Sequence, residues 1–178
     1  MADESLYLTE AHLDAFVDLA LRSNKPQHEL LAAFACIGVN AKGRTSEILG
    51  MKRHAFVTEH PEFRYYISRK GVLRERLFFT MASEKEIEIT RRWLSKHDQA
   101  TNGDTDSRIW HRINFEEDGI HLQRNLAPLS RTYVGKIASY IAKLLHLPNW
   151  KLYKNRSFRL LSVRRPSNAN GTVTNVQF

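Results

Sequence analysis

The chain has 178 residues, 42% of them hydrophobic and 26% charged, a composition that excludes a disordered or fibrous protein. Its 27 Lys and Arg against 19 Asp and Glu give a net charge of +8, which favours a polyanionic partner, nucleic acid before a membrane surface. The single Cys36 excludes a disulfide framework and an all-cysteine metal site. Without an apolar run of ~18 residues or a targeting sequence, we expect an intracellular protein that does not span a membrane.

The positive charge is concentrated in the last third of the chain. Residues 119–178 contain ten Lys and Arg and no Asp or Glu, whereas residues 1–118 hold the remaining seventeen basic residues and all nineteen acidic ones. We therefore expect the C-terminal third to bind a polyanion. The alternative interpretation is a solvated basic surface without a ligand.

The first part of the sequence predicts helices. Thr9 is placed to cap a helix over about 10–22, and Pro26 suits the first turn of a second helix over about 26–38. The second helix is apolar almost all round, which predicts that it is buried. A turn over 38–43 and a short helix opening at Arg44 follow.

The middle of the sequence predicts a β-hairpin and a further helix. Aromatic-rich runs at 63–68 and 76–80 flank a turn at 69–71, and Ser83 can cap a helix that continues to about 96. The polar stretch 97–107 predicts a mobile loop, and alternation at 108–115 predicts a third strand. A helix over about 131–146 completes one α+β domain over 1–178, mostly helical with a small antiparallel β-sheet.

No common cofactor motif is present. The glycines form no phosphate-binding loop, and the eight histidines form no metal-ligand pattern, with His54 and His60 six residues apart across an expected loop. We therefore expect neither a metal nor a small-molecule cofactor.

Arginines form the most informative pattern. Arg44 stands at the start of a short helix, and Arg156 and Arg159 lie three residues apart. Because a guanidinium group donates two parallel hydrogen bonds, such residues can clamp a phosphate, and Lys70 at the hairpin tip can add a further charge or a proton. The alternative is an arginine ion-paired near Glu47, with solvated basic residues elsewhere.

Several segments, in this order, resemble the catalytic domain of tyrosine recombinases of the phage-integrase type, most closely the eukaryotic, transposon-derived branch. LLAAFACIGVNAKGRTSEILGM is similar to the buried helix, turn and arginine motif of that family, although the turn looks longer. YYISRKGVLRERLFFT is similar to its β-hairpin, and LSRTYVGKIASYIAKLLHLPNWKLY to the helix before its second motif. LYKNRSFRLLSV lies on that second motif, H-x-x-R. The likeness covers roughly 8–178.

The resemblance implies roles for four residues. Arg44 and Arg159 match the two arginines that bind the scissile phosphate, and Lys70, or Arg69 if the alignment slips by one, matches the lysine that protonates the leaving oxygen. Arg156 stands where the family has histidine, and arginine can hold a phosphate but cannot act as a base. The implied partner is double-stranded DNA. Other expected DNA contacts are Arg69, Arg124, Arg131, Lys136, Lys151, Lys154, Arg164 and Arg165.

The tyrosine nucleophile of the family has no counterpart after Arg159, because all six tyrosines precede it. We therefore expect a nuclear, DNA-binding recombinase core without its last helix, related to DNA integration and recombination and unable to cleave DNA alone. Three alternatives stay open: a domesticated protein-interaction or structural module, an enzyme that receives a tyrosine from another chain, and self-association on DNA.

Overall fold

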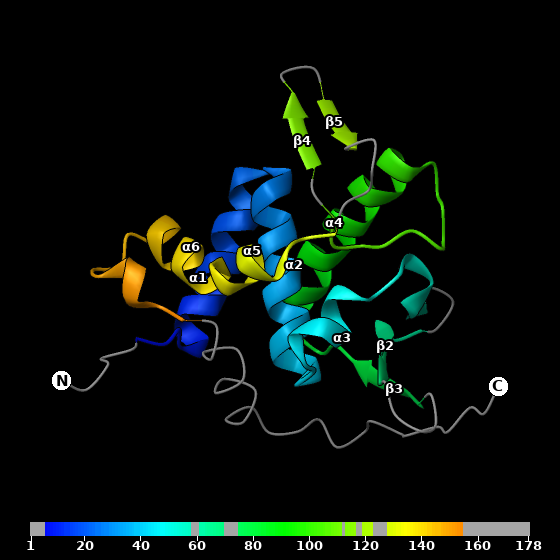
Figure 1. Cartoon of the computed structure of the whole chain (residues 1–178), viewed down its shortest axis with the longest axis horizontal. Helices are drawn as coiled ribbons and strands as arrows, with labels where there is room; N and C mark the ends of the chain where they lie inside the picture. Colours follow the sequence, from blue (N-terminus) through cyan, green and yellow to red (C-terminus); the bar gives the residue numbers. More distant parts are fainter. Residues whose placement is uncertain are drawn as a thin grey trace.

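The computed structural model describes residues 6–57, 61–69, 75–111, 113–116, 119–122 and 128–154, with the backbone alone for 113–116 and 119–122. Within these ranges a helical body carries a small three-stranded sheet at one end and a two-stranded ribbon at another (Figure 1). The predicted fold class, a mostly helical α+β chain with a small antiparallel sheet, is confirmed. No helix in the described part is both long and apolar enough to cross a membrane.

Helix α1 (Glu10–Ser23) begins where the sequence predicts. The Thr9 hydroxyl accepts a hydrogen bond from the His12 backbone N–H at 3.2 Å, and the His12 ring accepts one from the Thr9 N–H at 3.1 Å. These two bonds satisfy donors that a helix start leaves open. The predicted apolar stripe of Leu13, Phe16, Val17 and Ala20 is buried.

Helix α2 (Pro26–Ala41) is the centre of the body and packs between α1 and α4 (Glu84–Thr101) (Figure 1). It continues three residues beyond the predicted end, so the expected turn from Gly38 is wrong. Val39 and Ala41 are buried, and their contacts with the core favour another helical turn over an early stop. The turn before Arg44 is therefore only Lys42, with φ 51°, and Gly43.

Gly43 allows the end of α2 to approach the sheet closely. A Cβ atom there would lie 3.1 Å from the Ile67 side chain and 3.2 Å from that of Ile48. Both distances are tighter than ordinary van der Waals contact, so a larger residue would require the Ile67 side chain, or that of Ile48 on α3 (Thr45–Leu49), to shift.

The predicted hairpin is present. Strands β1 (Phe56–Val57), β2 (Arg64–Arg69) and β3 (Glu75–Thr80) form an antiparallel sheet in the order β1-β2-β3. The sequence analysis placed Arg69 in the turn, but it is the last residue of β2 and pairs with Glu75. Tyr65 and Ile67 point into the core, so the alternate residues of β2 form its other face.

Helix α4 starts at its predicted cap, where the Ser83 hydroxyl accepts from the Glu86 N–H, but it ends five residues later than predicted. The prediction of a mobile loop over 97–107 is thus wrong for residues 97–101, which belong to α4. His97 is buried, with ring nitrogens 2.8 Å from His111 Nε2 and 2.7 Å from Ser107 Oγ, and these partners hold the end of α4. The helix stops at Asn102, with φ 53°, followed by Gly103.

The predicted strand at 108–115 is only partly present. Ile109, Trp110 and His111 are all fully buried, so the side chains do not alternate between core and solvent there. The regular strand is β4 (Ile113–Glu116), paired antiparallel with β5 (Gly119–Leu122). Residues 108–111 instead form isolated bridges at two positions, Lys52 to Arg108 and His111 to Pro128.

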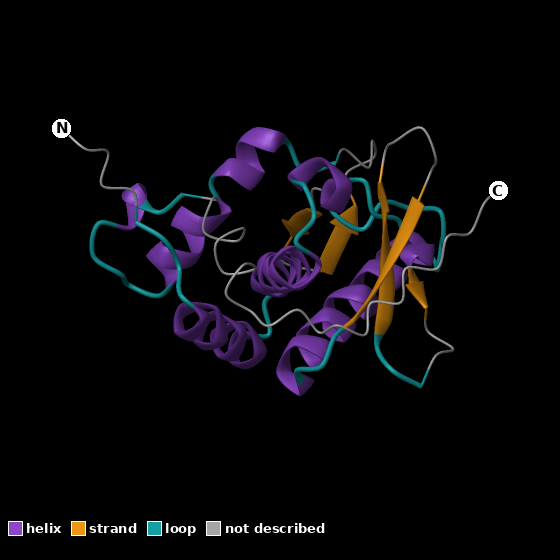
Figure 2. Cartoon of the chain, turned by 90° about the horizontal axis from the view of Figure 1, so that it is seen from below, coloured by secondary structure: helices purple, strands orange, loops and turns teal. Residues whose placement is uncertain are grey.

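The predicted helix over 131–146 forms as two pieces, α5 (Arg131–Gly135) and α6 (Ile137–Leu144), which meet at Lys136. The 3₁₀ turns η1 (Arg53–Ala55) and η2 (Trp150–Leu152) complete the described elements. Viewed from below, the three-stranded sheet lies at one side and most of the helices at the other (Figure 2).

Candidate functional site

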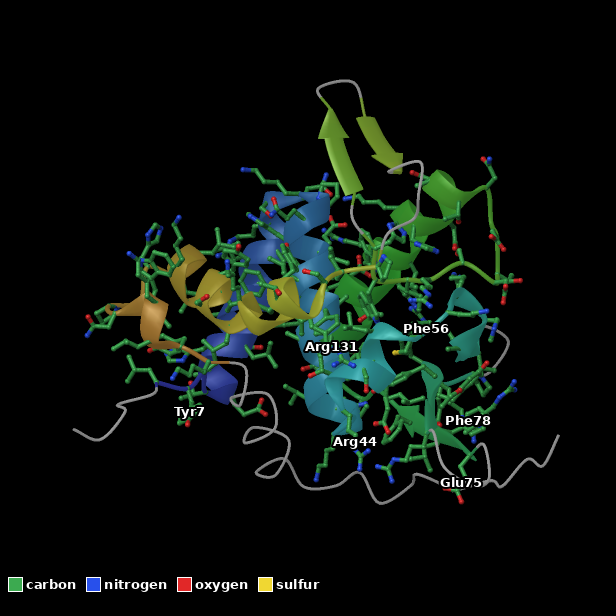
Figure 3. The ribbon with its side chains drawn as sticks, in the orientation of Figure 1. Tyr7, Arg44, Phe56, Glu75, Phe78 and Arg131 are labelled. Atoms are coloured by element: carbon green, nitrogen blue, oxygen red, sulfur yellow. The ribbon has the colours of Figure 1, made fainter. Side chains whose placement is uncertain are left out.

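Arg44 borders a cavity of about 420 Å³ formed by α3, η1 and β2. The polar side chains at its wall come from three separate stretches of sequence: Arg44, Ser46 and Glu47, then Lys52 and His54, then Tyr66 and Ser68. Figure 3 labels Arg44 at the start of α3, near the sheet. The cavity therefore combines cationic and hydroxyl groups, which suits an anion.

The Arg44 side chain is exposed at the start of α3. Its backbone N–H donates to Glu47 Oε2 at 2.8 Å, so the carboxylate of Glu47 caps the helix. Within the described ranges the Arg44 guanidinium forms no ion pair. The alternative of an Arg44–Glu47 ion pair is therefore not what the structure shows.

Glu47 joins α3 to the hairpin. Its side chain is only 10% exposed, and Oε1 lies 3.9 Å from Nε of Arg69, the last residue of β2. One carboxylate thus contacts the Arg44 backbone and the Arg69 guanidinium, which places two of the predicted phosphate-binding residues on either side of it.

Another part of the cavity wall contains a histidine and a tyrosine in contact. His54 Nδ1 lies 2.5 Å from the Tyr66 hydroxyl, and His54 Nε2 lies 3.7 Å from Asp106 Oδ1. Lys52 Nζ binds the same carboxylate oxygen at 2.7 Å. Asp106, in the loop after α4, therefore contacts both Lys52 and His54.

Two groups of this wall have shifted pKa values. Burial raises the pKa of the Tyr66 phenol above its usual range, although the nearby charges of Arg76 and Lys52 act in the opposite direction. The hydrogen bond and charge of Lys52 lower the pKa of the Asp106 carboxyl. At neutral pH the wall thus presents a neutral phenol and an ionised carboxylate.

The outer face of the hairpin carries arginines stacked on aromatic rings. Tyr66 and Phe78 pair across the strands with ring centroids 5.4 Å apart. The guanidinium of Arg76 lies 4.7 Å from the Tyr66 centroid, and that of Arg64 lies 4.8 Å from the Phe78 centroid. This ladder holds the Tyr66 ring from two sides and stabilises it through cation–π and aromatic contacts.

The remaining predicted DNA contacts do not join the cavity. Arg131, Lys136, Lys151 and Lys154 are exposed on α5, η2 and the segments beside them, and none of them lines the cavity. Figure 3 labels Arg131 at the start of α5. Lys143 and Lys151 lie 5.1 Å and 5.5 Å from the Trp150 centroid. We call the exposed cations Arg131, Lys136, Lys143, Lys151 and Lys154 the basic face.

Several predicted site residues lie outside the described residues: Lys70, Arg124, Arg156, Arg159, Arg164 and Arg165. Their predicted roles stay predictions.

Sequence reasoning missed Lys52, Tyr66 and Asp106, and it considered His54 only as a metal ligand. A usable signal was the MKRH segment directly after α3, which places basic residues next to Arg44 in sequence. Asp106 gave no such signal, because it lies more than fifty residues from its partners. Within the described part of the chain, no three His, Cys, Asp or Glu side chains gather to hold a metal ion.

Comparison by sequence finds no matching family model and no matching curated protein. Comparison by structure finds XerH site-specific recombinase bound to difH substrate, in a pre-cleavage complex, at 14% identity and a TM-score of 0.52, over 88% of this chain and 40% of that one. XerH in a post-cleavage complex with palindromic difH gives 14% identity and a TM-score of 0.55, over 89% and 40%. The Tn1549 transposon integrase in complex with circular intermediate DNA gives 14% identity and a TM-score of 0.51, over 93% and 53%.

These likenesses cover nearly all of this chain but only about half or less of each solved protein. At 14% identity they show the fold and not the activity. The chain therefore shares its fold with part of these solved recombinase and integrase structures, as the resemblance implied.

Proposed function

We propose that this chain is a DNA-binding domain of the recombinase and integrase type, and that the Arg44 cavity receives a phosphate of the DNA backbone. The observation that carries the proposal is the position of Arg44, an exposed guanidinium at a cavity that Lys52 and His54 also line. A guanidinium can donate two hydrogen bonds to one phosphate, and the lysine and histidine add charge or donors beside it. The solved neighbours, which are DNA complexes, support this proposal.

The basic face supplies a second, less specific contribution to the proposed binding. Its exposed lysines and arginine suit contacts with further phosphates, which release counterions and make affinity fall steeply with salt. In this proposal Lys70, Arg156 and Arg159 complete the phosphate site around Arg44, as the family resemblance implies.

We further propose that the residues of this sequence bind DNA without cutting it. Tyr65 is fully buried, Tyr66 is 6% exposed, and no tyrosine follows Arg159. A nicked suicide duplex, incubated with the chain and run on a denaturing gel, tests this. A covalent protein–DNA adduct formed by this chain alone would overturn it.

We also propose that this chain is a transposon-derived relative of recombinases that acts in the nucleus. A fluorescent fusion expressed in cultured animal cells tests the location. Exclusion of the fusion from the nucleus would contradict this part alone.

The central test is duplex binding measured by fluorescence anisotropy between 50 and 200 mM salt. Arg44→Ala should weaken binding by about tenfold or more, because it removes charge-assisted hydrogen bonds worth about 1.5–3 kcal/mol, and it should lower the salt slope by about one.

Arg22→Ala is the matched control for this test. Arg22 is exposed before the start of α2, and Arg44 follows its end, so a helix of about 24 Å separates them. Equal losses in the two variants would argue for diffuse charge and against the cavity. No binding at low salt would favour the protein-interaction module instead.

A further inference from the structure

The wall of the Arg44 cavity contains a hydrogen bond, between His54 and Tyr66, whose direction depends on protonation. Asp106 lies on the Nε2 side of His54, and a carboxylate there favours the neutral tautomer with its proton on Nε2. In that tautomer Nδ1 has a lone pair and accepts the hydrogen bond from the Tyr66 hydroxyl. The single proton of the phenol is then directed at His54 and away from the cavity.

Protonation of His54 reverses this bond. Both ring nitrogens of an imidazolium are donors, so Nδ1–H then donates to the Tyr66 oxygen. The phenol O–H must turn to another acceptor, and a phosphate oxygen in the cavity is such an acceptor. Burial raises the pKa of the Tyr66 phenol above its usual range, so the phenol is neutral at pH 6 to 8 and presents no negative charge to a phosphate.

We propose that Tyr66 is a phosphate-positioning residue of the Arg44 cavity, made available as a donor when His54 takes up one proton on binding of a DNA phosphate. This inference rests on the proposed function and adds to it Tyr66 and a change in the protonation of His54. No covalent bond changes: one proton moves from solvent to His54, and one hydrogen bond changes direction. Phosphate and imidazolium stabilise each other because their charges are opposite.

The charged surroundings of His54 come from every element around the cavity. They include an acidic set, whose carboxylates favour the imidazolium, and a basic set, whose charges oppose it. The acidic set is Asp106, Glu47 and Asp98, and the basic set is Lys52, Arg44, Arg53 and Arg76. Since Lys52 and Arg53 are already ion-paired, with Asp106 and Asp98, a phosphate entering next to Arg44 adds charge that favours protonation.

The first experiment measures duplex affinity at pH 8 and pH 6 at constant ionic strength. Binding by the unmodified chain should tighten about fivefold on acidification, below the roughly hundredfold limit that uptake of one proton sets over two pH units. His54→Asn places an amide oxygen close to the position of Nδ1, so Tyr66 keeps an acceptor that does not titrate. Whatever its affinity at pH 8, this variant should lose most of the gain in affinity between pH 8 and pH 6.

The matched control is His146→Asn. His146 is exposed, follows α6 and lies outside the cavity, so this variant removes one titrating histidine without touching the proposed pair. It should keep the fivefold gain. An equal loss in both histidine variants would overturn the inference, because it would mean that net charge alone produces the pH dependence.

Tyr66→Phe separates a positioning role from a structural one. The hydroxyl is directed at His54 in the neutral state, so its removal should weaken binding about threefold more at pH 6 than at pH 8, which corresponds to the loss of one hydrogen bond. The same loss at both pH values would indicate a structural role and overturn the proposal. Calorimetry at pH 6.5 in buffers of different ionisation enthalpy should show proton uptake on binding that His54→Asn reduces.

These outcomes separate the inference from the proposed function. If Arg44→Ala abolishes binding while the His54 and Tyr66 variants follow the unmodified chain at both pH values, the phosphate cavity stands and the proton-linked bond is wrong. If the unmodified chain does not bind the duplex at low salt, both fall.

Discussion

Two histidines of this chain each form a short polar contact with a second ring. Their surroundings differ, so we expect protonation of the two histidines to have different effects. His97 lies in the sealed helical core, 2.8 Å from His111, whereas His54 lies at the wall of an open cavity, 2.5 Å from Tyr66. In the core, burial and the charge of His111 oppose a proton on the His97 ring more strongly than Asp98 and Asp104 favour it. At the cavity, a ligand can stabilise a proton on the His54 ring. Charge changes in the core should therefore alter folding, and those at the cavity should alter binding.

The largest expected effect concerns a buried charge in the helical core and its contribution to the stability of the fold. Glu29 on α2 is fully buried and pairs with Lys96 on α4 at 2.5 Å. Lys96→Met would leave a buried carboxylate without its cation, and the free energy of unfolding should fall by about 3 kcal/mol. Urea unfolding followed by circular dichroism measures this.

The double variant Glu29→Leu with Lys96→Met is the control for the same pair. It removes both charges and should recover most of the lost stability, since an apolar pair can replace a buried ion pair. A double variant no more stable than the single one would show that packing at Lys96, and not charge, stabilises α2 against α4.

The second prediction concerns acid. Burial, followed by the charge of His111, lowers the pKa of His97 to about 4, against 6.5 in an unfolded chain. Between these values the unfolded state binds more protons, so the contribution of His97 is complete above pH 6.5 and is lost as pH falls towards 4. The free energy of unfolding should decrease by about 2 kcal/mol from pH 7.5 to pH 5.

A variant separates the effect of His97 on acid stability from the effects of other groups that also destabilise the fold in acid. The pKa of His28 is also lowered, by burial and by Lys25, so it adds to the acid sensitivity. His97→Gln should show a markedly smaller difference between the two pH values than the unmodified chain, whatever its absolute stability. An unchanged difference would place the acid sensitivity elsewhere.

The third prediction concerns the cavity and asks which property of Arg44 contributes to duplex binding. Arg44→Lys keeps one positive charge but loses the planar fork, so duplex binding should weaken by about fivefold with an unchanged salt slope. An unchanged duplex affinity of the lysine variant would mean that the cavity recognises charge and not the shape of a phosphate.

The smallest expected effect belongs to the basic face. Lys151 is exposed and its ammonium lies over Trp150, so Lys151→Gln should weaken binding about twofold and lower the salt slope by less than one. The loss should be the same for unrelated duplex sequences. A sequence-dependent loss would contradict a purely electrostatic face.

Local signals predicted much of the fold. Thr9, Pro26 and Ser83 marked three helix starts correctly, because caps depend on residues within one turn. The helix ends were less predictable. α2 and α4 continue past their expected ends because Val39 and His97 gain contacts with distant parts of the chain, which no window of sequence contains.

The candidate site likewise contains residues that local sequence could indicate and contacts that it could not. Arg44 could be found from its motif, and the hairpin that carries Arg69 from its aromatic strands. The MKRH segment could have pointed to Lys52 and His54, but their contacts with Tyr66 and Asp106 could not be found, because tertiary packing alone brings these residues together.

The ladder on the outer face of the hairpin gives its two arginines two separate binding surfaces. Stacking uses the flat face of a guanidinium group, whereas its N–H donors point outward from the edge, in the plane. Arg64 can thus keep its contact with Phe78 while the edge of its guanidinium group meets a further partner. Lysine in place of Arg64 or Arg76 would keep the charge and lose the flat face, so these two positions should tolerate that exchange poorly.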